Sequence, residues 1–93
     1  MSAYSDARLK TSVATISGAL DKVLAMRGVS YTVIKGERRS SGLIAQELRE
    51  VAPELVTEDD EGMLAVAYGN VVGYLIEAIR ELTIKVEKLE ANR

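Results

Sequence analysis

The last part of the chain carries a heptad repeat of aliphatic residues, and this repeat constrains the fold more than any other feature. Apolar side chains recur at alternating spacings of three and four, with valine or isoleucine at the a positions and leucine at the d positions. These positions are Val72, Leu75, Ile79, Leu82, Val86 and Leu89. The repeat predicts one helix over about residues 70–91, roughly 33 Å long at about 1.5 Å per residue, with Asn70 as its N-cap.

The apolar stripe of this predicted helix is wider than the a and d positions alone. Val71 and Ala78 extend it at g, and Ile76 extends it at e. That width suits several neighbouring helices or packing onto the rest of the chain, whereas β-branched a positions with leucine at d favour two-stranded coils. The periodicity therefore predicts association without fixing the number of copies. The alternative is a helix that packs only against its own domain.

Length and composition also favour association. A chain of 93 residues buries only about 60–65% of the surface that its unfolded form exposes, and without cysteine it has no disulfide to compensate. Further copies of the chain are the remaining way to enlarge the core. We expect one domain over residues 1–93.

Charge and residue types exclude several function classes. Twelve basic and fourteen acidic residues give a formal net charge of −2, with no basic footprint for nucleic acid or anionic membrane. No apolar run approaches the roughly 20 residues that cross a bilayer. Histidine and cysteine are absent, which removes the usual general base and the common zinc ligands. We expect no metal, no cofactor, no nucleic acid and no membrane partner, and any catalysis must use serine, threonine, lysine, tyrosine or carboxylates.

Before the heptad helix, the chain alternates short helical and strand patterns. A polar lead-in over residues 1–13 precedes a predicted helix at 17–27, with Thr15 or Ser17 as its cap and Gly28 after its end. A β-branched strand at 29–34 and a second strand at 42–45 enclose a charged turn, which predicts a hairpin.

A short helix at 46–51 is expected to stop before Pro53. Short strands at 55–56 and 63–68 flank an acidic turn. The predicted class is α+β: a small hairpin or sheet region with short helices over residues 14–68, and the long helix over residues 69–93.

Six segments, in order, resemble a known family. They are SDARLK at 5–10, ALDKV at 19–23 with GVSY at 28–31, GLIAQEL at 42–48, PELV at 53–56, VAY at 66–68 and LIEAIREL at 75–82. The chain is similar to the phage intramolecular chaperone peptidases, which are C-terminal domains of endosialidase tailspikes and of some tail fibres. The myelin regulatory factor carries a similar domain. The segment between Ile34 and Gly42 is short, so a protrusion that grips the fibre would be small here.

This resemblance implies a function and its residues. It implies a homotrimer, joined through a coiled coil or helix bundle, whose client is the upstream fibre or spike of the same polypeptide. Ser5 would be the nucleophile and Lys10 its base. The cut would fall at Tyr4–Ser5 or, as second choice, at Ser5–Asp6. The domain would act in the host cytoplasm during virion assembly and then leave the mature fibre.

Two alternatives remain beside that function. One is a non-catalytic coiled-coil oligomerisation module. The other is the processing domain of a membrane-tethered transcription factor, which the resemblance to the myelin regulatory factor permits.

The proposed pair sets two physical requirements. A lysine acts as a base only when its amine is neutral, which needs burial or a cationic neighbour such as Arg8. Residues five apart point about 140° apart on a helix and to opposite faces of a strand. Either the segment bends sharply, or the lysine comes from a neighbouring chain. We hypothesise that subunit assembly completes or buries the pair of Ser5 and Lys10.

Overall fold

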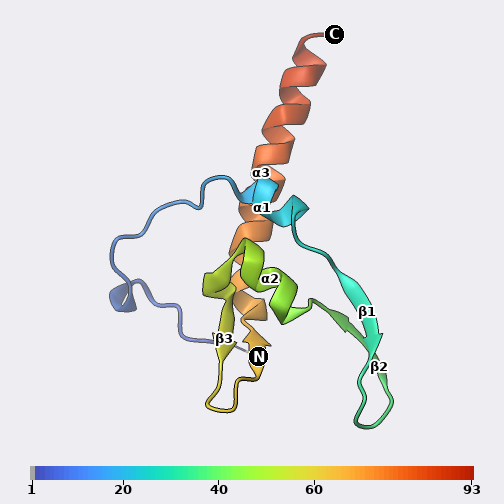
Figure 1. Ribbon diagram of the computed structural model, residues 1–93. Coiled ribbons are helices and arrows are strands. Elements are labelled where there is room, and N and C mark those ends of the chain that lie inside the picture. The colour runs from blue at the N-terminus through green and yellow to red at the C-terminus, as the bar shows by residue number, and fades with distance from the viewer. Residues whose placement is uncertain (1) are drawn as a thin grey trace.

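A computed structural model describes residues 2–93 as a long helical stem with a small α/β body around its first half (Figure 1). Both hairpins lie at the end of the molecule opposite the C-terminus. The elements in chain order are η1 (Ala7–Leu9, a 3₁₀ helix), α1 (Ala19–Leu24), β1 (Val29–Thr32), β2 (Arg39–Gly42), α2 (Ala45–Val51), η2 (Pro53–Leu55, a 3₁₀ helix), β3 (Val56–Glu58), β4 (Leu64–Val66) and α3 (Tyr68–Ala91). The predicted α+β class is confirmed.

The heptad segment forms α3 over its whole expected length. The helix begins two residues before the predicted Asn70, with Ala67 at the N-cap. This earlier start follows from β4, because the Ala67 amide donates to Leu55 O at 2.8 Å and anchors the chain directly before the helix. Asn70 then lies inside the first turn, where its amide donates to Ala67 O.

Helix α1 is shorter than the predicted 17–27, and the predicted caps were wrong. Gly18 has left-handed dihedrals (φ 66°, ψ 24°) and therefore precedes the helix as its N-cap. The first free amide, Ala19 N, donates to the carboxylate of Glu81 at 2.8 Å, so the cap comes from α3 and not from Thr15 or Ser17. At the other end the C-cap is Ala25, three residues before Gly28.

Two separate antiparallel hairpins complete the fold. In the first, Val29 pairs with Gly42 and Thr32 with Arg39, so the second strand begins three residues earlier than the predicted 42–45. The reason is a tight turn: Val33 N donates to Arg38 O at 2.8 Å, across positive φ angles at residues 36 and 37.

The second hairpin pairs Val56 with Val66. Its acidic turn is organised by Asp59, whose carboxylate accepts from the amides of Glu61 and Met63 at 2.9 Å.

One small cluster of buried side chains joins α1, α2, η2 and α3. Its members are Ala19, Leu20, Leu48, Ala52, Leu55, Val71, Tyr74 and Ala78. Three of the eight are alanine, and a fully buried large aliphatic or aromatic side chain contributes only about 1.5–3 kcal/mol. The core of a single chain is therefore small, as the length and composition predict.

The segment between β2 and α2 is held against the start of α3 by one tyrosine. Tyr68 Oη accepts from Leu43 N at 3.0 Å and donates to Leu43 O at 3.5 Å. The ring lies directly over Gly42: a Cβ there would collide with Tyr68 Oη and lie 3.1 Å from Tyr68 Cζ. Glycine is required at this position because the tyrosine occupies the space of a side chain.

We predict that Gly42→Ala lowers the free energy of unfolding by about 1–3 kcal/mol, the usual cost of overpacking, measured by urea denaturation. Gly28→Ala is the matched control, because a Cβ at Gly28 meets no atom within 4 Å. Adding Tyr68→Phe to Gly42→Ala removes the colliding hydroxyl and should recover part of the loss. Equal stability of the two alanine variants would contradict the close approach.

A second tyrosine links η2 to α3 inside the body. The buried Tyr74 hydroxyl donates to the Glu54 carboxylate. This hydrogen bond is the main reason that the pKa of Glu54 lies below its ordinary value of 4.5, and that the pKa of Tyr74 lies above its ordinary value of 10.0.

These pKa directions predict a stability plateau. A lowered carboxyl pKa gives stability that is present above about pH 4.5 and is lost as the pH falls through the lowered pKa. A raised tyrosine pKa gives stability that is present below about pH 10 and is lost as the pH rises through the raised pKa. Urea unfolding of Tyr74→Phe should therefore depend less on pH at both ends than that of the control Tyr4→Phe, and identical pH profiles would contradict the assignment.

Candidate cleavage site and association surface

One turn of 3₁₀ helix brings together the two residues that the sequence singles out. Asp6 is the N-cap of η1, and its carboxylate accepts from Arg8 N at 2.9 Å. The amides of Leu9 and Lys10 close the turn onto Asp6 O and Ala7 O. As a result, Lys10 Nζ donates to Ser5 Oγ of the same chain at 2.5 Å. Of the two geometries that the spacing allowed, the described segment adopts the sharp bend.

Charge around this turn is paired locally. Arg8 binds Asp6 through two side-chain hydrogen bonds, Nε to Oδ1 at 3.0 Å and Nη2 to Oδ2 at 2.9 Å. The side-chain hydrogen bond from Arg8 is the main cause that lowers the pKa of Asp6 below its ordinary value. Arg8 is thus engaged by an anion and is not the unpaired cationic neighbour for Lys10 that the sequence suggested. The capping role of Asp6 was not predicted from the sequence, although aspartate before a turn is its usual signal.

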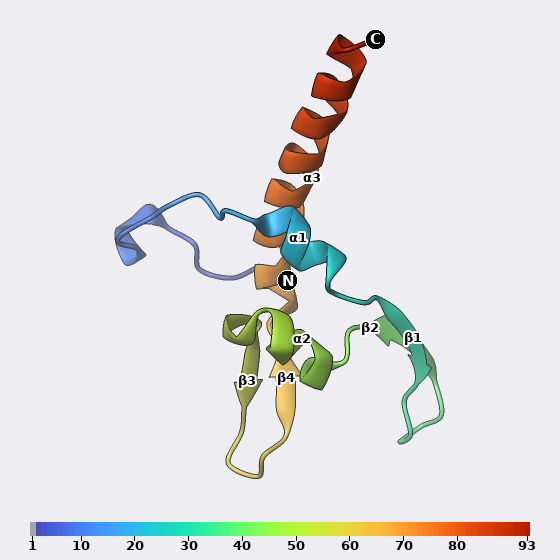
Figure 2. The ribbon, with the colours of Figure 1, turned by 45° about the horizontal axis from the view of Figure 1, so that its top comes forward.

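The pair of Ser5 and Lys10 lies in open solvent. Every residue from 2 to 15 is exposed, and the middle of the lead-in, in blue, loops out to one side of α3 in both ribbon views (Figures 1 and 2). The apolar Tyr4 and Leu9 beside the pair are exposed as well. The chain itself therefore supplies no burial for Lys10.

The predicted association surface is also uncovered. The six heptad positions keep between 43% and 70% of their surface exposed. Their uncovered row, which we call the seam, consists of Val72, Leu75, Ile79, Leu82, Val86 and Leu89. The side chains that α3 buries are instead Val71, Tyr74 and Ala78, at the g and c positions. From residue 82 to the end of α3, every residue is exposed.

A second part of the chain covers another side of α3. Residues 13–16 run along the helix beside Gly73, Ile76 and Glu77, where they border a shallow depression. At Gly73 an added Cβ would lie 3.4 Å from Ile16 Cδ1. In heptad terms this is the e and b side, whereas α1 lies on the g and c side. The chain thus covers both flanks of the first half of α3 and leaves the seam between them free.

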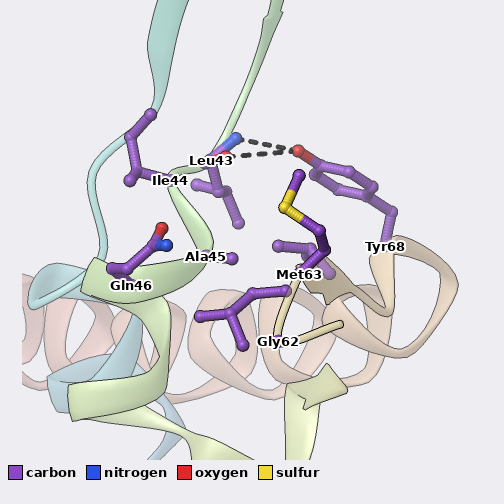
Figure 3. Close-up of a pocket in the computed structure, with 9 residues that line it drawn as sticks. Leu43, Ile44, Ala45, Gln46, Gly62, Met63 and Tyr68 are labelled. Atoms are coloured by element: carbon purple, nitrogen blue, oxygen red, sulfur yellow. Dashed lines mark hydrogen bonds between the residues drawn. The ribbon is translucent and has the colours of Figure 1, made fainter. Parts of the chain in front are cut away.

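A further pocket lies between the start of α2 and the second hairpin (Figure 3). Aliphatic side chains and Met63 line it, and the hydroxyl of Tyr68 points to Leu43 at its edge. Gln46 borders the same pocket, while its neighbour Glu47 is bound to Arg27 by two hydrogen bonds of 3.1 and 2.6 Å. The pocket brings together no nucleophile and base.

Within residues 2–93, no group of three or more histidine, cysteine, aspartate or glutamate residues is arranged to hold a metal ion. In the same part of the chain, no helix combines the length and apolar character that a membrane crossing needs.

Comparison with known proteins shows that the segment from the turn at Ser5 to β3 is similar to a family of chaperones. A peptidase family model described as "chaperone of endosialidase" matches residues 5–57, from Ser5 into β3. The chain belongs to this family.

The relatives found by the same comparison are phage fibre proteins. The long tail fiber proteins Gp37 of Enterobacteria phages K3 and T2 are each 40% identical over 97 residues, which cover 95% of this chain. Gp37 of Enterobacteria phage M1 is 31% identical over 96 residues and covers 92% of it. The chain spans 8%, 7% and 38% of the lengths of these three relatives, respectively.

Proposed function

We propose that this chain is an intramolecular chaperone that associates as a homotrimer, assists folding of the phage tail fibre upstream in the same polypeptide, and then releases itself by cleavage next to Ser5. Membership of the chaperone family and the similarity to tail fibre proteins support the chaperone part. The observation that carries the catalytic part is the 2.5 Å contact between Lys10 Nζ and Ser5 Oγ.

The chemistry needs only groups that the chain contains and water. Neutral Lys10 removes the hydroxyl proton of Ser5, and Ser5 Oγ attacks the carbonyl carbon of Tyr4. The bond between Tyr4 C and Ser5 N breaks, and the amine leaves with the proton that Lys10 returns. The product is an ester between the Tyr4 acyl group and Ser5 Oγ. Water hydrolyses this ester to leave a carboxylate on Tyr4 and the free hydroxyl of Ser5.

The surroundings of Lys10 support a link between cleavage and assembly. In the structure, Lys10 Nζ donates to Ser5 Oγ, whereas a general base must accept the proton of the Ser5 hydroxyl. Burial favours the neutral amine, and the lead-in obtains none from its own body. We propose that neighbouring subunits supply this burial, so that cleavage follows association.

The exposed seam supports association. Six aliphatic side chains at heptad spacing lie in solvent, and most helical stability in proteins comes from packing of an apolar face. Partner helices would supply this packing to the second half of α3. Joining three chains gives upstream segments a high effective concentration, which helps intertwined β structure that folds slowly and is prone to aggregation. This work would take place in the host cytoplasm during virion assembly, before the domain leaves the fibre.

A non-catalytic oligomerisation module remains the second candidate, and the solvent exposure of the pair of Ser5 and Lys10 favours it. The two candidates share the seam and differ only in whether the parent fibre is cut.

We predict that Ser5→Ala and Lys10→Met each reduce cleavage of the full-length parent at least about 100-fold, the usual contribution of a positioned base or more. Intact mass spectrometry measures both the yield and the cut position. Ser2→Ala is the control, because Ser2 lies in the same exposed lead-in but outside the turn. Unchanged processing of Ser5→Ala would leave the non-catalytic module as the function.

We predict that Ile79→Asp converts the trimer to monomers, because burying an unpaired carboxylate costs several kcal/mol per chain. Sedimentation velocity at micromolar concentration measures the mass. Ile84→Asp is the matched control: Ile84 is 52% exposed on the same helix but lies at f, off the seam. A wild-type chain that sediments as a folded monomer, or an Ile79→Asp trimer, would exclude the seam as the interface.

A further inference from the structure

Two apolar surfaces lie on opposite flanks of the seam. The first, which we call the groove, lies on the d and g side of α3, and its lining includes Val23, Met26, Leu43, Tyr68, Val71 and Leu75. The second, which we call the ridge, consists of the exposed side chains of Val13 and Ile76 on the e side, which border the shallow depression where residues 13–16 run along α3. Val13 keeps 82% of its surface exposed. In both ribbon views the lead-in and the first hairpin leave α3 on opposite sides (Figures 1 and 2).

The charges of the outer heptad positions indicate how copies of α3 align. In a parallel, in-register coil, a g residue of one helix lies across from the e residue of the next heptad of its neighbour. Lys85 occupies g and Glu90 occupies the following e. The two are opposite in charge and pair between neighbours in this arrangement. The sequence of α3 thus favours parallel, in-register helices.

The same rule applied two heptads earlier brings the groove to the ridge. Val71 occupies g and lies in the groove, and Ile76 occupies the following e and belongs to the ridge. Parallel association therefore places the Val71 side of one copy against the Ile76 side of the next. Leu75 belongs to both the seam and the groove, so the groove is continuous with the proposed interface.

We propose that the groove of each subunit binds the ridge of the adjacent subunit, so that Val13 of one chain inserts near Met26 of the next. This inference rests on the proposed association through the seam. Each copy offers a groove on one flank and a ridge on the other, so the contacts close into a ring under rotational symmetry. Opposite flanks of one helix carry the two surfaces, which excludes the same contact within a single chain.

The placement of Val13 gives this contact a consequence for cleavage. Val13 follows Lys10 by three residues in the exposed lead-in. When a neighbouring groove holds Val13, the turn of Ser5 and Lys10 is carried toward the neighbour's surface instead of remaining in solvent. The docked ridge is thus a positioning element that couples association to burial of the lysine.

The absence of native cysteine allows a direct crosslinking test. Chains that carry Val13→Cys alone are refolded together with chains that carry Met26→Cys alone, both in the Ser5→Ala background, and are treated with a short bismaleimide. A link between Val13→Cys and Met26→Cys chains then reports a contact between subunits. The control replaces Met26→Cys by Ile34→Cys, at the 95% exposed tip of the first hairpin. We expect a crosslink yield about tenfold above the control, because docking raises the local thiol concentration.

Sedimentation of the same samples separates the possible failures. Trimers that crosslink support the inference, and trimers that crosslink no better than the control overturn it while leaving the seam intact. Monomers overturn both the inference and the proposed association. A second measurement uses Val13→Ser in the cleavable parent. We expect cleavage to slow about tenfold in chains that remain trimeric. An unchanged cleavage rate would contradict the coupling of Val13 docking to cleavage.

Discussion

The packing of α1 against the first half of α3 is the contact on which the other features depend. Ala19 and Leu20 join Tyr74 and Ala78 in the buried cluster, and the Glu81 carboxylate fixes the start of α1. This contact fills the g and c side of α3 and directs the preceding segment across its other flank. What remains uncovered is the heptad seam. Helix α3 thus has two apolar surfaces. One packs against its own domain, and the other, the seam, is available to other copies.

The lead-in shows how far local interactions determine a reactive geometry. A carboxylate cap and two backbone hydrogen bonds produce one tight turn, and this turn is enough to place an amine against a hydroxyl. The same interactions leave both groups in water. The placement of Ser5 beside Lys10 and the activation of Lys10 as a base are therefore separate requirements. Residues 5–10 alone produce the placement, and the proposed assembly of subunits would provide the activation.

Sequence patterns predicted the elements better than their boundaries. The heptad located α3 within two residues, because its period extends over many turns. The second strand was misplaced by three residues, since the tight turn at residues 36 and 37 depends on positive φ angles that alternation of apolar residues does not report. The cap of α1 was missed because Glu81 lies 62 residues away in sequence, and only the folded contact brings it to Ala19.

At the candidate site, spacing arithmetic excluded a regular helix or strand but could not choose between a bend and a neighbouring chain. Predicting the bend would have required recognising Asp6 as a cap. The exposure of the lead-in depends on the path of residues 11–15, one of which, Ser12, has a left-handed φ of 54°. A single non-glycine residue in that conformation redirects the lead-in, and no periodic pattern signals it.

Among the described residues, every position of α3 from residue 82 onward is exposed. Under the proposed association, partner helices would stabilise this part of α3, and dilution should let it fray from the C-terminal end. Newly made chains would thus stay partly unwound until others arrive. Ordering of this part of α3 would then require association, and it would precede cleavage next to Ser5 in the lead-in near the N-terminus.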